Sequence, residues 1–329
     1  MRTDTATVLD FAIAGCAKSG TTAIAELLDA HPSIYMSDVK ETNYFVHGFE
    51  PVEAVRTANG GLAITFGNPA DHVDTPERFA GQFAGAAPGQ RLGEASPLYL
   101  TNAAVPGRLL EHNPDVRVVL VLRNPSDVAY SNFVHHVRDE AEAIPADDVE
   151  GFADESRYAD PGLHVFARHL DLPRYATQLP AWTGRIAPER LHIEIFEEFR
   201  AAPEAAIDRI VAFLGLEPLV REDERAAVGA VNQSRLPRFH LVHRFVLDDG
   251  LVKRVLRAIV PVKRRRRLRL ALERLNAGRR PSLPEPVRAR LDARFAPDRA
   301  HVASVLGRPV PAWDALQAGS AGADGRPSR

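Results

Sequence analysis

Runs of apolar residues that end at glycine or proline predict a chain in which strands and helices alternate. Residues 8–14 form a short apolar run that ends at Gly15, and residues 22–30 have the pattern of a helix that stops at a His-Pro pair. A strand, a tight turn and a helix in this order are typical of the first unit of an α/β domain.

Two later apolar runs extend this pattern. Residues 116–122 (VRVVLVL) are rich in β-branched side chains with little polar alternation, which is typical of a strand in a parallel sheet covered on both faces. Residues 191–196 predict a further strand, and the helix after it begins at Pro203 and ends at Gly215. Its apolar stripe predicts a face that packs in the core and consists of Ile207, Ile210, Val211 and Leu214. We therefore expect an α/β fold of the P-loop type, with three layers and a central parallel sheet flanked by helices.

The length of the chain favours one large domain. Of its 329 residues 45% are hydrophobic, which is enough for a single substantial core. We expect this domain to span residues 1–314, with insertions at about 46–92 and 138–172 that are rich in glycine, proline, aspartate and alanine and lie over a site. A basic helical segment is expected at about 236–277 and a disordered tail at 315–329.

Charge and cysteine content narrow the possible surroundings of the protein. A formal net charge of -2 gives no reason to expect binding to nucleic acid, and a single cysteine, Cys16, excludes an intrachain disulfide framework and fits a reducing compartment. No stretch approaches the roughly 18 apolar residues of a membrane span. Residues 13–16 are similar to the cleavage box of a lipoprotein signal peptide, but Asp10 interrupts the apolar run before them. We expect a soluble, cytoplasmic protein.

The turn between the first strand and the first helix has the composition of an anion-binding loop. Residues 15–22 (GCAKSGTT) would direct backbone N–H groups and a helix N-terminus at one point, where a phosphate or sulfate binds. The residues expected to bind it are Ala17, Lys18, Ser19, Gly20, Thr21 and Thr22. The loop has the Gly-x4-Gly frame of a nucleoside triphosphate site, but Thr21 stands where such sites carry lysine. A lysine as early as Lys18 would face a differently placed leaving group.

Residues 18–22 resemble the 5′-phosphosulfate loop of the sulfotransferases that use 3′-phosphoadenosine 5′-phosphosulfate (PAPS). The resemblance continues through the His-Pro pair at 31–32 and through residues 40–45 (KETNYF), which are similar to the Lys-Glu-Pro-x-Phe/Tyr-Phe element of bacterial and heparan-type members. Thr42 stands where the family usually has proline, whereas Glu41 is retained.

Three further segments resemble the same family. Arg123, which is followed by Asn-Pro and, eight residues after the arginine, by Ser131, is similar to the family's 3′-phosphate element. A guanidinium fork and a hydroxyl suit phosphate oxygens. Residues 174–182 are similar to a Gly-x-Tyr-x-x-x-Leu-x-x-Trp helix, although their spacing is also typical of core packing. A closing loop that reaches the donor's 3′-phosphate in the family is matched by Gly278, Arg279 and Arg280. The resemblance spans about residues 8–314.

The resemblance implies a metal-independent sulfotransferase that converts PAPS to adenosine 3′,5′-bisphosphate. The acceptor would be a hydroxyl or an amine of a carbohydrate, a lipid-linked glycan or a small natural product. In this reaction Lys18 would donate to the leaving oxygen, Glu41 would remove the acceptor proton and Lys40 would orient the sulfuryl oxygens. No motif singles out one of the twelve histidines as a different base.

Two other functions remain open at this point. A nucleoside triphosphate-dependent kinase of related fold would need a lysine at position 21 and an acidic Mg²⁺ ligand at a strand end, and the sequence offers neither. A non-catalytic nucleotide-binding scaffold is the other alternative, but it would have no need of Lys18 and Glu41.

Residues 251–269, a basic run beside an apolar stripe, predict a solvated helix face or a peripheral contact with an anionic membrane. The oligomeric state is not constrained.

Overall fold

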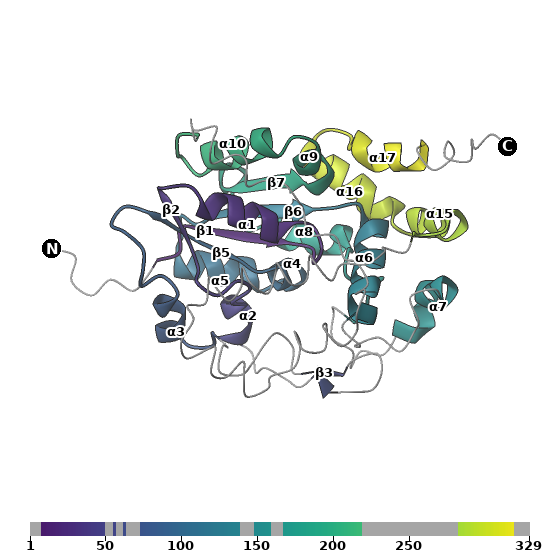
Figure 1. Ribbon diagram of the computed structural model, residues 1–329, viewed down its shortest axis with the longest axis horizontal. Coiled ribbons are helices and arrows are strands. Elements are labelled where there is room, and N and C mark those ends of the chain that lie inside the picture. The colour runs from purple at the N-terminus through teal and green to yellow at the C-terminus, as the bar shows by residue number, and fades with distance from the viewer. Residues whose placement is uncertain are drawn as a thin grey trace, which may run out of the picture.

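The computed structural model describes residues 8–49, 73–138, 148–158, 167–218 and 282–318, together with two short strands between the first two ranges. The main sheet is parallel and has the order β2-β5-β1-β6-β7, as Figure 1 shows. Its strands are β1 (Phe11–Gly15), β2 (Ile34–Met36), β5 (Arg91–Ala95), β6 (Arg117–Leu122) and β7 (Leu191–Ile195). A separate antiparallel pair is formed by β3 (Val55–Arg56) and β4 (Leu62–Ala63). The predicted α/β fold with a central parallel sheet is confirmed.

Helices cover both faces of this sheet because successive side chains of a strand point to opposite sides. Ala12 and Leu120 pack into one apolar core, and Ile13 and Val119 pack into another. The first core is completed by α2 (Tyr44–His47), α4 (Leu98–Thr101), α5 (Val105–His112) and α8 (Tyr175–Thr183). The second is completed by α1 (Thr21–Asp29), α9 (Phe196–Ala201) and α10 (Pro203–Phe213). Two covered faces explain why residues 116–122 are almost continuously apolar.

Most of the predicted elements are present, with boundaries shifted by a few residues. The first predicted strand and helix are β1 and α1, and the helix predicted from Pro203 is α10, with Ile210 and Val211 buried. Two strands of the sheet, β2 and β5, were not predicted. β2 has only three residues, and the sequence RLGEA of β5 has neither polar-apolar alternation nor a run of β-branched residues. β5 begins at Arg91, next to the end expected for the first insertion at about residue 92.

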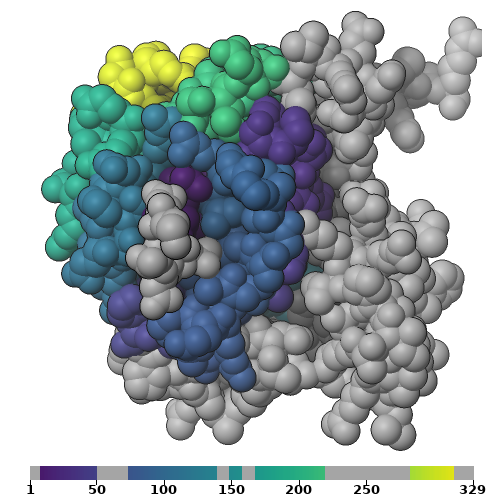
Figure 2. All heavy atoms as spheres, turned by 90° about the vertical axis from the view of Figure 1, so that its left-hand side faces the viewer, coloured from purple at the N-terminus to yellow at the C-terminus, as the bar shows by residue number. Residues whose placement is uncertain are grey.

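The first insertion contributes to the core as well as to the surface. It contains α3 (Pro76–Gly81), whose Phe79 ring stacks on Tyr44 with ring centroids 4.4 Å apart. Phe83 is also buried, so the segment is anchored by aromatic side chains in spite of its loop-like composition. In Figure 2 the blue segment that contains α3 and β5 forms much of the coloured face.

The second insertion is anchored in a similar way beside α6 (Pro125–Arg138). It contains α7 (Val149–Ala153) and η2 (Glu155–Tyr158), and Phe152 of α7 stacks on Phe133 of α6 with ring centroids 4.8 Å apart. The short η3 (Pro188–Arg190) then leads into β7.

The C-terminal helices pack onto helices α6, α7, α8 and α9. They are α15 (Glu285–Arg294), α16 (Ala296–Leu306) and α17 (Pro311–Ala318). Buried Trp313 anchors α17, which ends at Ala318, and the disordered tail expected from residue 315 stays a prediction. The basic segment expected at 236–277 and the tail residues 319–329 lie outside the described residues. In the described part of the chain, no helix is both long and apolar enough to cross a bilayer.

Candidate functional site

Most of the predicted site residues lie at one edge of the sheet, where the parallel strands end. The loop 16–20 follows β1, and Arg123 follows the neighbouring strand β6. The connection after β1 leads toward β2 and the connection after β6 leads toward β7, in opposite directions along the sheet. Such a reversal leaves a crevice at the carboxyl ends of the two strands, which is where open α/β sheets bind ligands.

The loop after β1 has the tight geometry of an anion cradle. Lys18 and Gly20 both adopt left-handed backbone conformations, with φ of 69° and 88°, and Gly20 caps the N-terminus of α1. A Cβ atom on Gly20 would lie 2.6 Å from the Phe196 ring, so the loop needs glycine for both conformation and space. Ser19 is fully buried, and its hydroxyl has no hydrogen-bond partner in the described structure. A buried hydroxyl of this kind fits a phosphate oxygen.

Arg123 is attached directly to this loop. Its Nη1 donates to the Lys18 carbonyl at 2.8 Å, and its guanidinium lies over the Phe196 ring, 4.9 Å from the ring centroid. The Tyr175 hydroxyl donates to the Arg123 carbonyl at 2.8 Å and accepts from the Arg123 N–H at 3.2 Å. Arg123, which is predicted to bind phosphate, is therefore held at both its side chain and its backbone. Tyr175 is in the core, as its spacing predicted, and also supports the site.

Glu197 joins three elements behind Arg123. Its carboxylate accepts from the Asn124 N–H at 3.1 Å and from the Trp313 indole at 2.8 Å, and lies 4.0 Å from the Arg123 Nε. Burial raises the pKa of Glu197, while the hydrogen bonds from Trp313 and Asn124 lower it. The Asn124 side chain accepts from the Ser126 N–H at 3.0 Å and so caps the start of α6. Nothing in the sequence pattern indicated Glu197.

Lys40 and Glu41 lie on the other side of β1, beside the end of β5. The Glu41 N–H donates to the Ala95 carbonyl at 3.1 Å, and its carboxylate forms an ion pair with Lys40. The Lys40 side chain is 14% exposed and that of Glu41 is 36% exposed, so the carboxylate is open to a reactant. Glu41 has a left-handed φ of 62°. Glu94, which no sequence pattern indicated, accepts a hydrogen bond from the next N–H of this segment, that of Thr42.

The remaining predicted ligands are distributed less uniformly. Thr21 is buried at the start of α1 and Thr22 follows it, half-buried. Ser131 is buried on α6, two turns after Arg123. The residues predicted for the closing loop lie outside the described residues and are Gly278, Arg279 and Arg280.

Cys16 packs as a structural residue beside the loop. It is fully buried, its Sγ donates to the Leu172 carbonyl at 3.6 Å, and burial raises the pKa of its thiol. A buried neutral thiol is a poor nucleophile, so Cys16 has a structural role at the tight turn.

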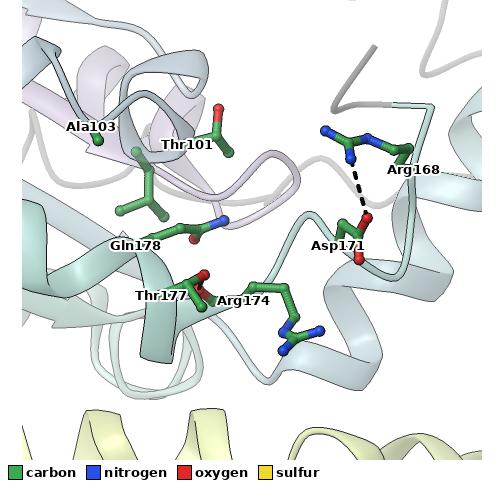
Figure 3. A pocket seen from close by; sticks show the side chains of 8 residues that line it. Thr101, Ala103, Arg168, Asp171, Arg174, Thr177 and Gln178 are labelled. Atoms are coloured by element: carbon green, nitrogen blue, oxygen red, sulfur yellow. Dashed lines mark hydrogen bonds and ion pairs between the residues drawn. The ribbon is translucent and has the colours of Figure 1, made fainter. Parts of the chain in front are cut away.

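A cavity of about 360 Å³ adjoins this region (Figure 3). The Gln178 amide of its wall donates at 2.9 Å to the Leu172 carbonyl, the group that also accepts from Cys16. Figure 3 shows an ion pair between Arg168 and Asp171 on the opposite wall. The polar residues that line the cavity are Thr101, Arg168, Asp171, Arg174, Thr177 and Gln178.

Comparisons with known proteins agree with this geometry. A sequence model of the sulfotransferase family matches residues 10–220. The mouse bifunctional heparan sulfate N-deacetylase/N-sulfotransferase 4 is 27% identical over 209 residues, which are 63% of this chain and 22% of the mouse protein. The human N-deacetylase/N-sulfotransferase 2 is 26% identical over 211 residues, which are 64% of this chain and 22% of that protein. The chain thus matches about a fifth of the length of these relatives.

A solved bacterial structure has the same fold. The sulfotransferase from Alicyclobacillus acidocaldarius aligns with a TM-score of 0.66 and 22% sequence identity, over 94% of this chain and 99% of the bacterial one. At this identity the likeness shows the fold, and the chemistry has to be argued from the residues of the site.

Proposed function

This chain belongs to the sulfotransferase family, and from that premise we propose that it transfers a sulfuryl group from PAPS to a hydroxyl or amine. The observation that carries the proposal is the cradle after β1, where the buried Ser19 hydroxyl lacks a partner in the described structure beside a left-handed Lys18. Donors at the start of α1 and the dipole of that helix favour an anion there. PAPS would bring the reactive sulfuryl group on a phosphate that can occupy this cradle.

In the loop after β1, some residues would bind the 5′-phosphate and Lys18 would stabilise the charge of the leaving oxygen. Ser19, Thr21 and Thr22 would bind the 5′-phosphate, and the Lys18 ammonium would donate to the oxygen that leaves. Such positioning and charge stabilisation supply most of the catalysis in related phosphoryl transfers. A lysine in this position provides the positive charge that a metal ion provides elsewhere, so we propose a reaction that needs no metal.

Arg123 and Ser131 would select the donor by its 3′-phosphate. Arg123 is anchored through Lys18 and Tyr175, so its guanidinium is oriented before the donor binds. A guanidinium held in this way loses little side-chain entropy on binding phosphate. ATP has no 3′-phosphate and would not gain this interaction.

Glu41 would act as the general base for the acceptor. Its carboxylate is the more exposed member of the pair with Lys40, and it projects from a backbone held against Ala95. A base must reach the acceptor proton, and the exposed carboxylate of Glu41 is open to the acceptor.

The cavity beside Leu172 is the place that we assign to the acceptor. Its amide, guanidinium and hydroxyl groups suit a ligand rich in hydroxyl or amine groups, as a sugar or a small natural product is. Two relatives are named for sulfation of heparan sulfate, which makes a glycan a reasonable first acceptor to test.

Calorimetric titration with adenosine 3′,5′-bisphosphate in EDTA, compared with ATP and Mg²⁺, tests the donor site. We expect binding of the bisphosphate without metal, and loss of at least tenfold in affinity in both Lys18→Ala and Arg123→Ala. Arg123→Ala should weaken the binding of adenosine 3′,5′-bisphosphate far more than that of adenosine 5′-phosphate. A preference for Mg²⁺-ATP would instead support a kinase, and bisphosphate binding without any sulfated product across diverse acceptors would support a scaffold.

A further inference from the structure

Glu94 is a fully buried carboxylate that has no part in the roles assigned so far. It is the next-to-last residue of β5, and none of its side chain is exposed to solvent. A carboxylate in such a place lowers the stability of the fold unless several donors compensate its lost hydration. Its hydrogen bonds therefore indicate what it is retained for.

Glu94 accepts hydrogen bonds from Thr42, in the loop that carries Glu41, and from Ser96 and Tyr99, which both support that loop. Its Oε1 accepts from the Thr42 N–H at 3.2 Å and from the Thr42 hydroxyl at 2.8 Å. The same oxygen accepts from the Ser96 hydroxyl, whose oxygen in turn accepts from the Asn43 N–H at 3.0 Å. Glu94 thus fixes two consecutive backbone N–H groups, that of Thr42 directly and that of Asn43 through Ser96.

These two N–H groups lie in a strained stretch of backbone. Glu41 and Asn43, on either side of Thr42, have left-handed φ values of 62° and 50°. A residue with a side chain loses on the order of 1–2 kcal/mol in this conformation, which persists when surrounding contacts hold it. Tyr99 adds a bond of 3.3 Å from the Phe45 N–H to its hydroxyl, one turn farther along. Thr42 therefore lies between the two strained residues and makes two of the hydrogen bonds that hold them.

We propose that Glu94 is a positioning residue that fixes the conformation of Glu41 and thereby directs its carboxylate toward the acceptor. This inference rests on the proposed role of Glu41 as the base. Thr42 stands where the resemblance leads one to expect proline, and its two hydrogen bonds to Glu94 supply the rigidity that a proline ring would supply. Glu94 touches neither donor nor acceptor and acts through the backbone of residues 41–43.

Amide hydrogen exchange tests whether Glu94 holds the loop, and it needs no acceptor substrate. Glu94→Leu keeps the bulk of the side chain and removes the acceptor oxygen, whereas Glu94→Gln keeps a carbonyl oxygen for the same donors. We expect at least tenfold faster exchange of the Thr42 and Asn43 amides in Glu94→Leu, and less than threefold change in Glu94→Gln. Glu194→Gln is the matched control, because Glu194 is also a buried, next-to-last strand residue, and it should leave these amides unchanged.

Turnover separates positioning from a general loss of structure. With saturating PAPS and water as acceptor, Glu94→Leu should form bisphosphate at least tenfold more slowly, with bisphosphate affinity within twofold of wild type. In a Glu41→Gln background the same substitution should lower the rate by less than twofold, because its effect runs through Glu41. Glu94→Gln should restore most of the rate.

Equal loss of rate in both backgrounds, or unchanged exchange in Glu94→Leu, would overturn the inference. If Glu94→Leu does not fold, Ser96→Ala removes the link between the Asn43 N–H and Glu94 and keeps both bonds from Thr42. Unchanged exchange of the Asn43 amide in this variant would have the same meaning. Absence of bisphosphate binding by the wild type would refute the proposed function instead, while the exchange result would still decide whether Glu94 holds the loop.

Discussion

At the scale of single residues, the site depends on backbone conformations that few residue types tolerate. Lys18, Glu41 and Asn43 are the residues with side chains that take a positive φ in the described structure. Two of them, Lys18 and Glu41, are the residues to which we assign chemistry. Each is held by a buried polar neighbour, Arg123 for the first and Glu94 for the second, through the adjoining backbone. Strain of this kind is commonly found at functional sites.

The buried carboxylate of Glu94 should make stability depend on pH. Burial raises the pKa of Glu94 from 4.5 to about 7, although bonds from Ser96, Thr42 and Tyr99 oppose the rise. Below pH 4.5 the group is protonated in both the folded and the unfolded chain, and above pH 7 it is ionised in both. Between these limits only the folded chain keeps the proton, so stability should fall as the pH rises, by on the order of 3 kcal/mol.

Urea unfolding at pH 5, 6, 7 and 8 checks this expectation against Glu94→Gln, which cannot ionise. The free energy of unfolding of the wild type should fall more steeply over this range than that of the variant. Parallel curves would mean that Glu94 has the same proton affinity in the folded and the unfolded chain.

At the scale of elements, α8 combines a structural face with a functional one. Tyr175, Leu179 and Trp182 are buried in the core, as their spacing predicted, and an adjacent side of the helix lines the cavity through Thr177 and Gln178, together with the N-cap residue Arg174. An amphipathic helix can present a binding surface without cost to the core, because the two faces do not overlap.

Filling the cavity from α8 should weaken acceptor binding and leave donor binding intact. Thr177→Tyr adds a ring at an exposed position on the cavity wall, and we expect the acceptor KM to rise at least fivefold. Thr183→Tyr is the matched control, since Thr183 is an exposed residue of the same helix that does not line the cavity. Steady-state kinetics with an acceptor that the protein sulfates would measure the change in acceptor KM. Calorimetry with adenosine 3′,5′-bisphosphate would measure donor binding. A rise in KM for both variants would place the acceptor elsewhere.

At the scale of the whole molecule, distant parts of the chain converge behind the phosphate loop. Trp313 of α17 donates to Glu197 at the start of α9, and Glu197 accepts from the backbone beside Arg123. The C-terminal helix is thereby connected to a residue that we expect to bind the donor. Such contacts are made only when the fold is complete, which couples the site to the stability of the molecule.

Replacing Trp313 should therefore affect both stability and donor affinity. Trp313→Phe keeps much of the packing and leaves the buried Glu197 oxygen without its donor, which should cost about 1–3 kcal/mol of unfolding free energy. Bisphosphate affinity should fall several-fold. Trp182→Phe removes another buried indole bond, from Trp182 to the Leu100 carbonyl, and should lower stability without changing affinity. Equal affinities for the two variants would exclude the coupling through Glu197.

Elements with strong local signals could be predicted from the sequence alone. The β-branched run of β6, the turn after β1 and the apolar stripe of α10 predicted the fold class, because each pattern follows from the geometry of one element. Lys18 was predicted from the loop in the same way, and Arg123 was predicted from its resemblance to the family's 3′-phosphate element, since both motifs are continuous in sequence.

The residues that support the predicted site residues become visible only in the tertiary structure. β5 is a strand because β1 and β2 pair with it, and its Glu94 meets Thr42 across 52 residues of chain. Glu197 meets Asn124 across 73 residues and Trp313 across 116. No local pattern marks such residues, because their role is created by neighbours that folding brings together. Hydrogen bonds to buried carboxylates are formed between elements, and a sequence read element by element does not contain them.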